Sequence, residues 1–132
     1  MSAASNYLEN KILDHVLTAT AYTQPSRYIA LFTQSPGESG SFTYEISTSG
    51  TAYARQAVTF AAASSGSSAT NATVTFPTAT ANWGTITHVA VVDGDTEGAG
   101  NVLFYGAVTT SKTIETGDTF QISSGNLTIS LD

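Results

Sequence analysis

The chain has 132 residues, which suits one domain with one core; hydrophobic residues make up 41% of it. Only 11% of residues are charged, against roughly a quarter in ordinary soluble domains, and the net charge is −6. The four basic residues are scattered, which argues against binding to nucleic acid or to an anionic membrane: they are Lys11, Arg27, Arg55 and Lys112. Without cysteine, no disulfide framework and no thiolate metal site can form. We expect neither a signal peptide in residues 1–9 nor a membrane span.

One segment, residues 6–17, has the pattern of an amphipathic helix. Asn6 is a suitable N-cap, and Glu9 three residues later completes a capping-box pattern. The apolar residues of the segment recur at helical spacing and form one stripe: Leu8, Ile12, Leu13 and Val16. Two interpretations stay open. The helix covers the domain's own sheet, or it docks onto a neighbouring subunit.

After residue 18 the pattern becomes that of short β-strands separated by turn residues. The expected strands are 28–33, 53–60, 73–76, 86–92, 102–109, 119–122 and 127–131. Strands of this length and spacing predict an all-β domain, a β-sandwich or jelly-roll-like fold over residues 28–131 behind the N-terminal helix. We find no internal repeat and no domain boundary, so residues 1–132 are predicted to form a single domain. The long irregular stretch 35–51 is typical of a binding loop.

Residues that could support catalysis are few. The two histidines are His15, expected on the exposed side of the helix, and His88, expected to make a structural hydrogen bond. Nothing in the sequence brings them together with a serine and an aspartate, and no nucleophile-elbow motif is present. We therefore predict a protein that is not an enzyme and that has no catalytic residues and no cofactor.

Acidic residues cluster once, at Asp93, Asp95 and Glu97. Oxygen ligands at alternate positions followed by glycine resemble the start of an EF-hand loop. The resemblance ends at the twelfth position, where Phe104 stands in place of the bidentate glutamate. These residues are weak candidates for a metal site, and the competing interpretation is a polar hairpin loop in which Asp93-Gly94 supplies the turn.

The aromatic residues divide into predicted core and predicted contact residues. The phenylalanines in the strands are expected in the core: Phe32, Phe60, Phe76, Phe104 and Phe120. Trp83 is interpreted as a structural residue at one end of the sandwich, with a sugar-stacking platform as the alternative. Tyrosine offers a large area with a polar tip and is favoured at interfaces, so the interface candidates are Tyr22, Tyr28, Tyr44 and Tyr53.

Several motifs together resemble a family of short virion proteins of tailed bacteriophages that are commonly labelled tail fibre proteins. The motifs are NYLENKILDH at 6–15, ALFT at 30–33, YARQ at 53–56, FPTAT and WGT at 76–85, and LFYG at 103–106 with GD at 117–118. The similarity covers residues 6–132, and the stretch 38–49 departs most from the pattern. Related chains also resemble capsid decoration, or cement, proteins.

The resemblance implies a structural role on the virion, after assembly in the cytoplasm of the bacterial host. Because the chain has no repeat and no extended shaft, we favour a capsid decoration protein that binds the major capsid protein and stabilises the shell. A dimer or trimer is expected, since decoration proteins match the symmetry of their site. The alternative is a tail fibre or tail-associated adhesin module that contacts host glycans. In either case the partners are virion proteins, with no nucleic acid and no membrane.

Overall fold

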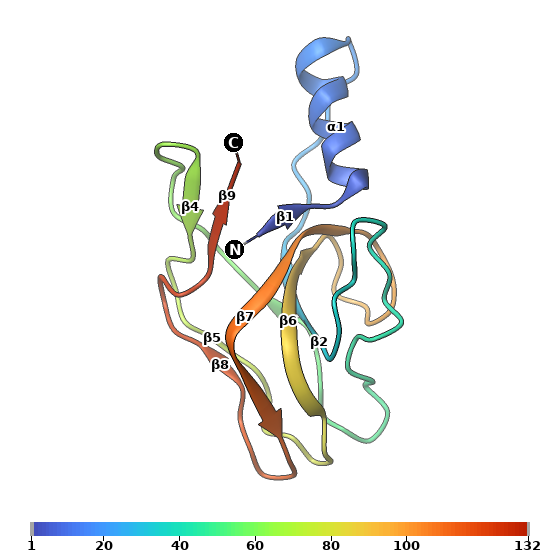
Figure 1. Cartoon of the computed structure of the whole chain (residues 1–132), viewed down its shortest axis with the longest axis vertical. Coiled ribbons are helices and arrows are strands. Elements are labelled where there is room, and N and C mark those ends of the chain that lie inside the picture. Colours follow the sequence, from blue (N-terminus) through green and yellow to red (C-terminus); the bar gives the residue numbers. More distant parts are fainter. Residues whose placement is uncertain (1, 132) are drawn as a thin grey trace.

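A computed structural model describes residues 2–131 of the chain (Figure 1). In chain order its elements are β1 (Ala3–Ala4), α1 (Asn6–Leu17), β2 (Tyr28–Phe32), β3 (Gln56–Ala57), β4 (Ser67–Ala69), β5 (Val74–Thr75), β6 (Gly84–Val92), β7 (Val102–Ile114), β8 (Gln121–Ile122) and β9 (Thr128–Ser130). These elements confirm the prediction of an all-β domain with one N-terminal helix.

The main sheet has five antiparallel strands in the order β1-β7-β6-β2-β3. Its central strands are rich in β-branched and aromatic residues, which favour extended backbone. The ladder between β6 and β7 shifts register between Ile86, which pairs with Lys112, and His88, which pairs with Ala107. The extra residues of β7 form a bulge. A bulge bends its strand and increases the local twist, and β7 bends visibly along its length (Figure 1).

Both faces of the main sheet are covered. Two short ribbons, β4–β9 and β5–β8, accompany the main sheet. On one face, Leu31, Val91 and Leu103 belong to a cluster with Phe76 and Phe120, which flank the β5–β8 ribbon. On the other face a second cluster contains Ala30, Phe32, Ala90, Val92 and Val102, which Phe42 covers from the loop after β2. Burial on both faces explains why β2 and the end of β6 are continuous apolar runs rather than alternating ones.

The helix occupies the predicted residues 6–17, but its N-cap lies one residue earlier than predicted. Ser5, not Asn6, is the N-cap: its hydroxyl accepts a hydrogen bond from Leu8 N (3.3 Å) and donates one to the Val102 carbonyl. Asn6 is the first helical residue, so the predicted Asn6–Glu9 capping box is wrong. Ser5 is buried against β7, and this cap therefore also fixes the start of the helix on the main sheet.

Three strand predictions need correction. Within the predicted strand 53–60 only Gln56–Ala57 pairs with β2, and Phe60 makes an isolated bridge with Thr70. Tyr53, Arg55 and Val58 are buried, so burial in this segment does not follow the strict period of two of a regular strand. The strand predicted over 102–109 continues to Ile114, and β4 at Ser67–Ala69 was not predicted. Opposite the main sheet stand two short ribbons rather than a second large sheet.

Candidate interaction surface

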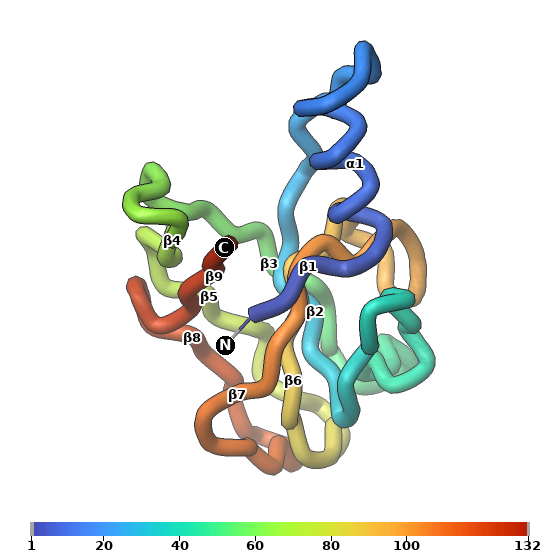
Figure 2. The backbone as a smooth tube through the Cα atoms, turned by 45° about the horizontal axis from the view of Figure 1, so that its top comes forward, coloured from blue at the N-terminus to red at the C-terminus, as the bar shows by residue number. Residues whose placement is uncertain are grey.

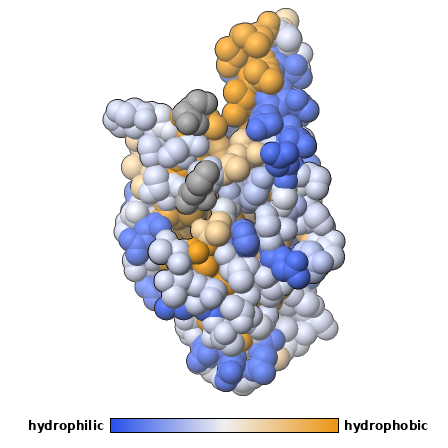
Figure 3. Space-filling view, in the orientation of Figure 1, coloured by the Kyte–Doolittle hydropathy of each residue, from blue (hydrophilic) through white to orange (hydrophobic). Residues whose placement is uncertain are grey.

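The helix α1 projects beyond the sheets, and only its first half packs against them (Figures 1 and 2). Leu8 is buried against the core, and Ile12 is partly buried. Leu13, Val16 and Leu17 are 54%, 69% and 73% exposed, and we call these three residues the apolar stripe. Apolar side chains gather on one side of the projecting helix (Figure 3). Over residues 2–131 the chain has no helix with the length and hydropathy to cross a membrane.

The segment after α1 runs back along the helix. His15 Nδ1 accepts a hydrogen bond from Tyr22 N (3.0 Å), and the Tyr7 and Tyr22 rings meet edge to face at 6.5 Å. Burial, followed by the neighbouring Tyr7 and Asp93, raises the pKa of Tyr22 to about 12. Its hydroxyl has no hydrogen-bond partner among the described residues. Helix and return segment thus form one arm, and His15 lies on its exposed side as predicted.

A groove of about 430 Å³ opens between α1 and the β4–β9 ribbon. Its lining is almost entirely apolar and includes Leu8, Ile12, Phe60, Leu103, Phe104 and Ile129. Leu131, which is half exposed, and Arg27 also line it. The apolar stripe is not part of this lining. The protein therefore presents a concave apolar surface beside a convex one.

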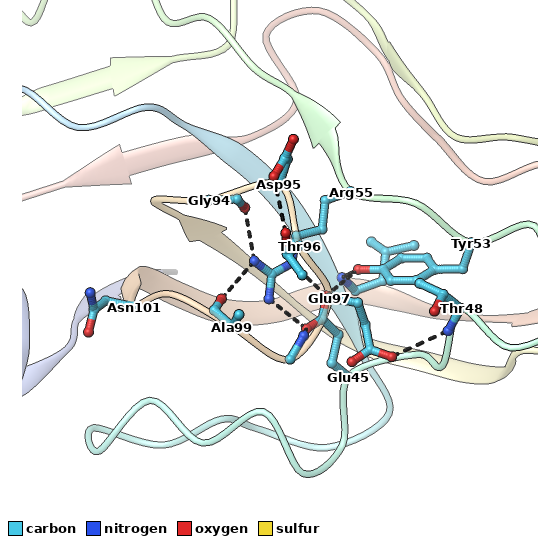
Figure 4. Close-up of polar contacts among 12 residues, drawn as sticks. Glu45, Thr48, Tyr53, Arg55, Gly94, Asp95, Thr96, Glu97, Ala99 and Asn101 are labelled. Atoms are coloured by element: carbon cyan, nitrogen blue, oxygen red, sulfur yellow. Dashed lines mark hydrogen bonds and ion pairs between the residues drawn. The ribbon is translucent and has the colours of Figure 1, made fainter.

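The second site of concentrated polar contacts is the buried ion pair between Arg55 and Glu45 (Figure 4). Both side chains are fully shielded from solvent. Arg55 donates through Nε to Glu45 Oε2 (2.8 Å) and through Nη2 to Oε1 (2.7 Å). Glu45 also accepts from Tyr53 Oη (2.7 Å) and Gly98 N (2.9 Å). Burial lowers the pKa of Arg55, but the hydrogen bonds and charge of Glu45 outweigh it, so the net shift is upward and the pair stays ionised.

The same arginine organises the acidic loop that resembles a calcium site. Arg55 Nη1 donates to the carbonyl oxygens of Gly94 and Ala99, both at 2.9 Å (Figure 4). Asp93 accepts from Asn101 N (2.7 Å) and Nδ2 (3.0 Å). In the part of the chain that the structure describes, no three acidic or histidine side chains come together as metal ligands. The guanidinium of Arg55 therefore occupies two carbonyl oxygens of this loop.

The remaining acidic candidates point to other partners. Asp95 accepts from the Thr96 hydroxyl (3.3 Å), and Glu97 accepts from Thr48 N (3.3 Å). Glu97 therefore ties the acidic loop to the long loop after β2. This long loop, predicted as a binding loop, supplies Glu45 to the ion pair and Phe42 to the second core cluster. Both loops serve to hold one another in place.

The four candidate interface tyrosines occupy different environments. Tyr44 is 43% exposed, whereas Tyr22 and Tyr28 are partly buried. Tyr53 is a core residue: it is 2% exposed, and its hydroxyl accepts from Leu31 N (3.1 Å) while donating to Glu45. Tyr53 is therefore unavailable for a surface contact.

Trp83 is buried as well, with 5% of its surface exposed. Its Nε1 donates to the Thr51 carbonyl (2.8 Å), and its ring meets Tyr53 edge to face at 5.5 Å. A sugar-stacking platform needs an open ring face, so the structural interpretation of Trp83 is the correct one. His88 shares a hydrogen bond with the Thr87 hydroxyl (2.8 Å), as expected of a structural residue.

Sequence reasoning missed the most exposed part of the apolar surface. Leu17 was not among the apolar residues predicted for the helix. The groove has no local sequence signature, because its lining comes from segments far apart in the sequence. The sequence signal that could have revealed this surface is the width of the helix's apolar face, which is broader than one contact with the sheet would cover.

Comparison with known protein families gives a match that spans almost the whole chain. The family model of the podophage GP4 fiber I protein gp80 matches residues 3–130. A comparison with curated proteins finds none that matches the chain. The chain belongs to the podophage GP4 fiber I protein gp80 family, which confirms its resemblance to phage proteins labelled as fibre proteins.

Proposed function

We propose that this chain is a structural component of a phage fibre, and that it works by binding other virion proteins rather than by catalysis. The family match over residues 3–130 carries this proposal, because the family is one of fibre proteins. The projecting helix adds support, since three large apolar side chains on it are more than half exposed. Exposed large apolar side chains that lie together on one element are typical of an interaction site.

The charge distribution favours proteins as partners. Of the four basic residues, Arg55 is fully buried in its ion pair and cannot contact a phosphate. Lys11 lies over the Tyr7 ring, at 5.6 Å from its centre, on the helix. The remaining cations do not form a patch, and a polyanion would meet a surface of net charge −6.

Capsid decoration is the second candidate, and the compact shape of the chain favours it. The described residues pack against the two faces of the main sheet, without an extended shaft or a repeated unit (Figure 1). Such a protein can bind across the junctions between copies of the major capsid protein and stabilise the shell by mass action. The two candidates differ in where on the particle the chain sits.

The position of this chain on the virion distinguishes the fibre proposal from capsid decoration. Because the chain has no cysteine, Ser123→Cys in the exposed turn after β8 creates a single attachment point for a gold label. Labelled protein is added to particles that lack the chain, and the particles are imaged. Label at the tail fibres supports the proposal. Label spread over the shell overturns it in favour of decoration, and no saturable binding to the particle overturns both. Unlabelled wild-type protein, added in excess, must displace the label.

A further inference from the structure

We propose that the groove beside α1 is occupied by the apolar stripe of a second copy of this chain, in a two-fold dimer in which each helix enters the other's groove. We build here on the proposed function, because we take the exposed apolar surface to be an assembly contact. The proposed partner of that surface is a second copy of the same chain.

The size of the groove matches the stripe. A cavity of about 150 Å³ holds one benzene-sized group. A groove of about 430 Å³ therefore has room for about three such groups. The stripe provides three side chains of this class, Leu13, Val16 and Leu17. They lie exposed on a projecting helix and are absent from the lining of their own groove, so they are available to the groove of a second copy.

Charge also matches. Glu9 is exposed and lies one helical turn before Leu13, on the same face as the stripe. Arg27 lines the groove, and its Nη1 donates to the Pro25 carbonyl (3.0 Å). Within residues 2–131 the ion pair that forms is that of Arg55 with Glu45. Among these residues, Arg27 therefore has no carboxylate within ion-pair distance. An incoming helix would bring a carboxylate next to its stripe, and the groove offers a guanidinium beside its apolar lining.

Symmetry favours a mutual exchange. A two-fold contact uses the same patch on both copies, so it covers both stripes and both grooves at once. A one-way contact would leave one stripe and one groove open at the ends of every assembly. Docking of an amphipathic helix into an apolar groove is an established mode of recognition, in which the anchors recur at helical spacing.

The test measures the mass of the full chain in solution by sedimentation equilibrium over a wide range of concentrations. We expect a reversible monomer–dimer equilibrium. Leu17→Asp places a charge in the apolar contact and should weaken dimerisation by at least about tenfold. Leu17 is largely exposed, so its circular dichroism and melting curve should match those of the monomeric wild type. Lys11→Gln is the matched control, because it changes the charge equally on another face of the helix.

Charge reversal separates a second copy from any other occupant. Glu9→Arg and Arg27→Glu should each weaken the dimer, and the double variant should restore it, because the pair is re-formed with opposite polarity. Lys11→Glu controls for the change in net charge of Arg27→Glu. A chain that stays monomeric at the highest attainable concentration overturns the proposal. A trimer, a dimer insensitive to Leu17→Asp, or a double variant no better than the single variants overturns it as well. Because these measurements need no virion, they fail independently of the labelling experiment.

Discussion

Removing the carboxylate of Glu45 should destabilise the fold more than any change at an exposed charge. Four donors converge on this group: two from Arg55, one from Tyr53 and one from Gly98 N. Glu45→Ala would leave a fully buried guanidinium without its counter-ion. Breaking a buried pair in this way costs about 3–5 kcal/mol, a large fraction of the 5–15 kcal/mol that stabilises a typical domain. For a chain of this size the melting temperature should fall by roughly 10–20 °C.

Urea denaturation followed by circular dichroism gives the free energy of unfolding for this comparison. Glu115→Ala, which removes an exposed carboxylate, is the control and should stay within about 0.5 kcal/mol of the wild type. The double variant Glu45→Met with Arg55→Met should lose less free energy of unfolding than the sum of the losses of its two single variants, because no buried charge is left unpaired. A loss below about 1 kcal/mol for Glu45→Ala, or full additivity of the double variant, would refute a coupled buried pair.

Three further predictions concern a glycine, a tyrosine and a metal ion. Gly66→Ala should lower the free energy of unfolding by more than the roughly 1 kcal/mol expected of the control Gly50→Ala. Both glycines have positive φ, but only at Gly66 would the new Cβ lie 2.7 Å from a backbone carbonyl oxygen. Chemical denaturation measures both variants. Because burial raises the pKa of Tyr22 to about 12, above the unfolded value of about 10, the stability linked to its neutral form is complete below pH 10 and is lost as pH rises through 12. The ultraviolet titration of wild type minus Tyr22→Phe should accordingly show a midpoint near 12, and a midpoint near 10 would contradict the burial of this hydroxyl. Calcium should leave the melting temperature unchanged, because Arg55 already binds the loop carbonyls; a rise that saturates with calcium would show that the loop binds the ion.

The parts of the fold that could be predicted are those whose pattern is set by local neighbours. The apolar run at β2 and the turn-bounded run at β6 are strands because their residues are buried on both faces of the sheet. The helix follows from the spacing of Leu8 and Ile12. Its cap was misplaced by one residue, because Ser5 and Asn6 are both good N-caps and only the contact with the Val102 carbonyl decides between them.

The parts that could not be predicted depend on contacts between distant segments. Arg55 looks like a scattered surface charge in the sequence, and its partner Glu45 lies within an irregular stretch. The pair forms because the chain brings the loop after β2 and the acidic loop to opposite sides of one guanidinium (Figure 4). The local periodicity of the sequence does not indicate that these distant segments meet.

The breadth of the apolar face of α1 connects the sequence to the proposed dimer. Successive helical residues are about 100° apart, so Leu8 and Ile12 lie on one side of this face while Leu13 and Leu17 lie on the other. A single flat contact with the sheet covers the first pair and leaves the second exposed, as the structure shows. The two interpretations of this helix, as a cover for its own sheet and as a contact for a neighbour, are therefore compatible. Each describes a different part of one broad face, and the two parts meet at Ile12, which lines the groove.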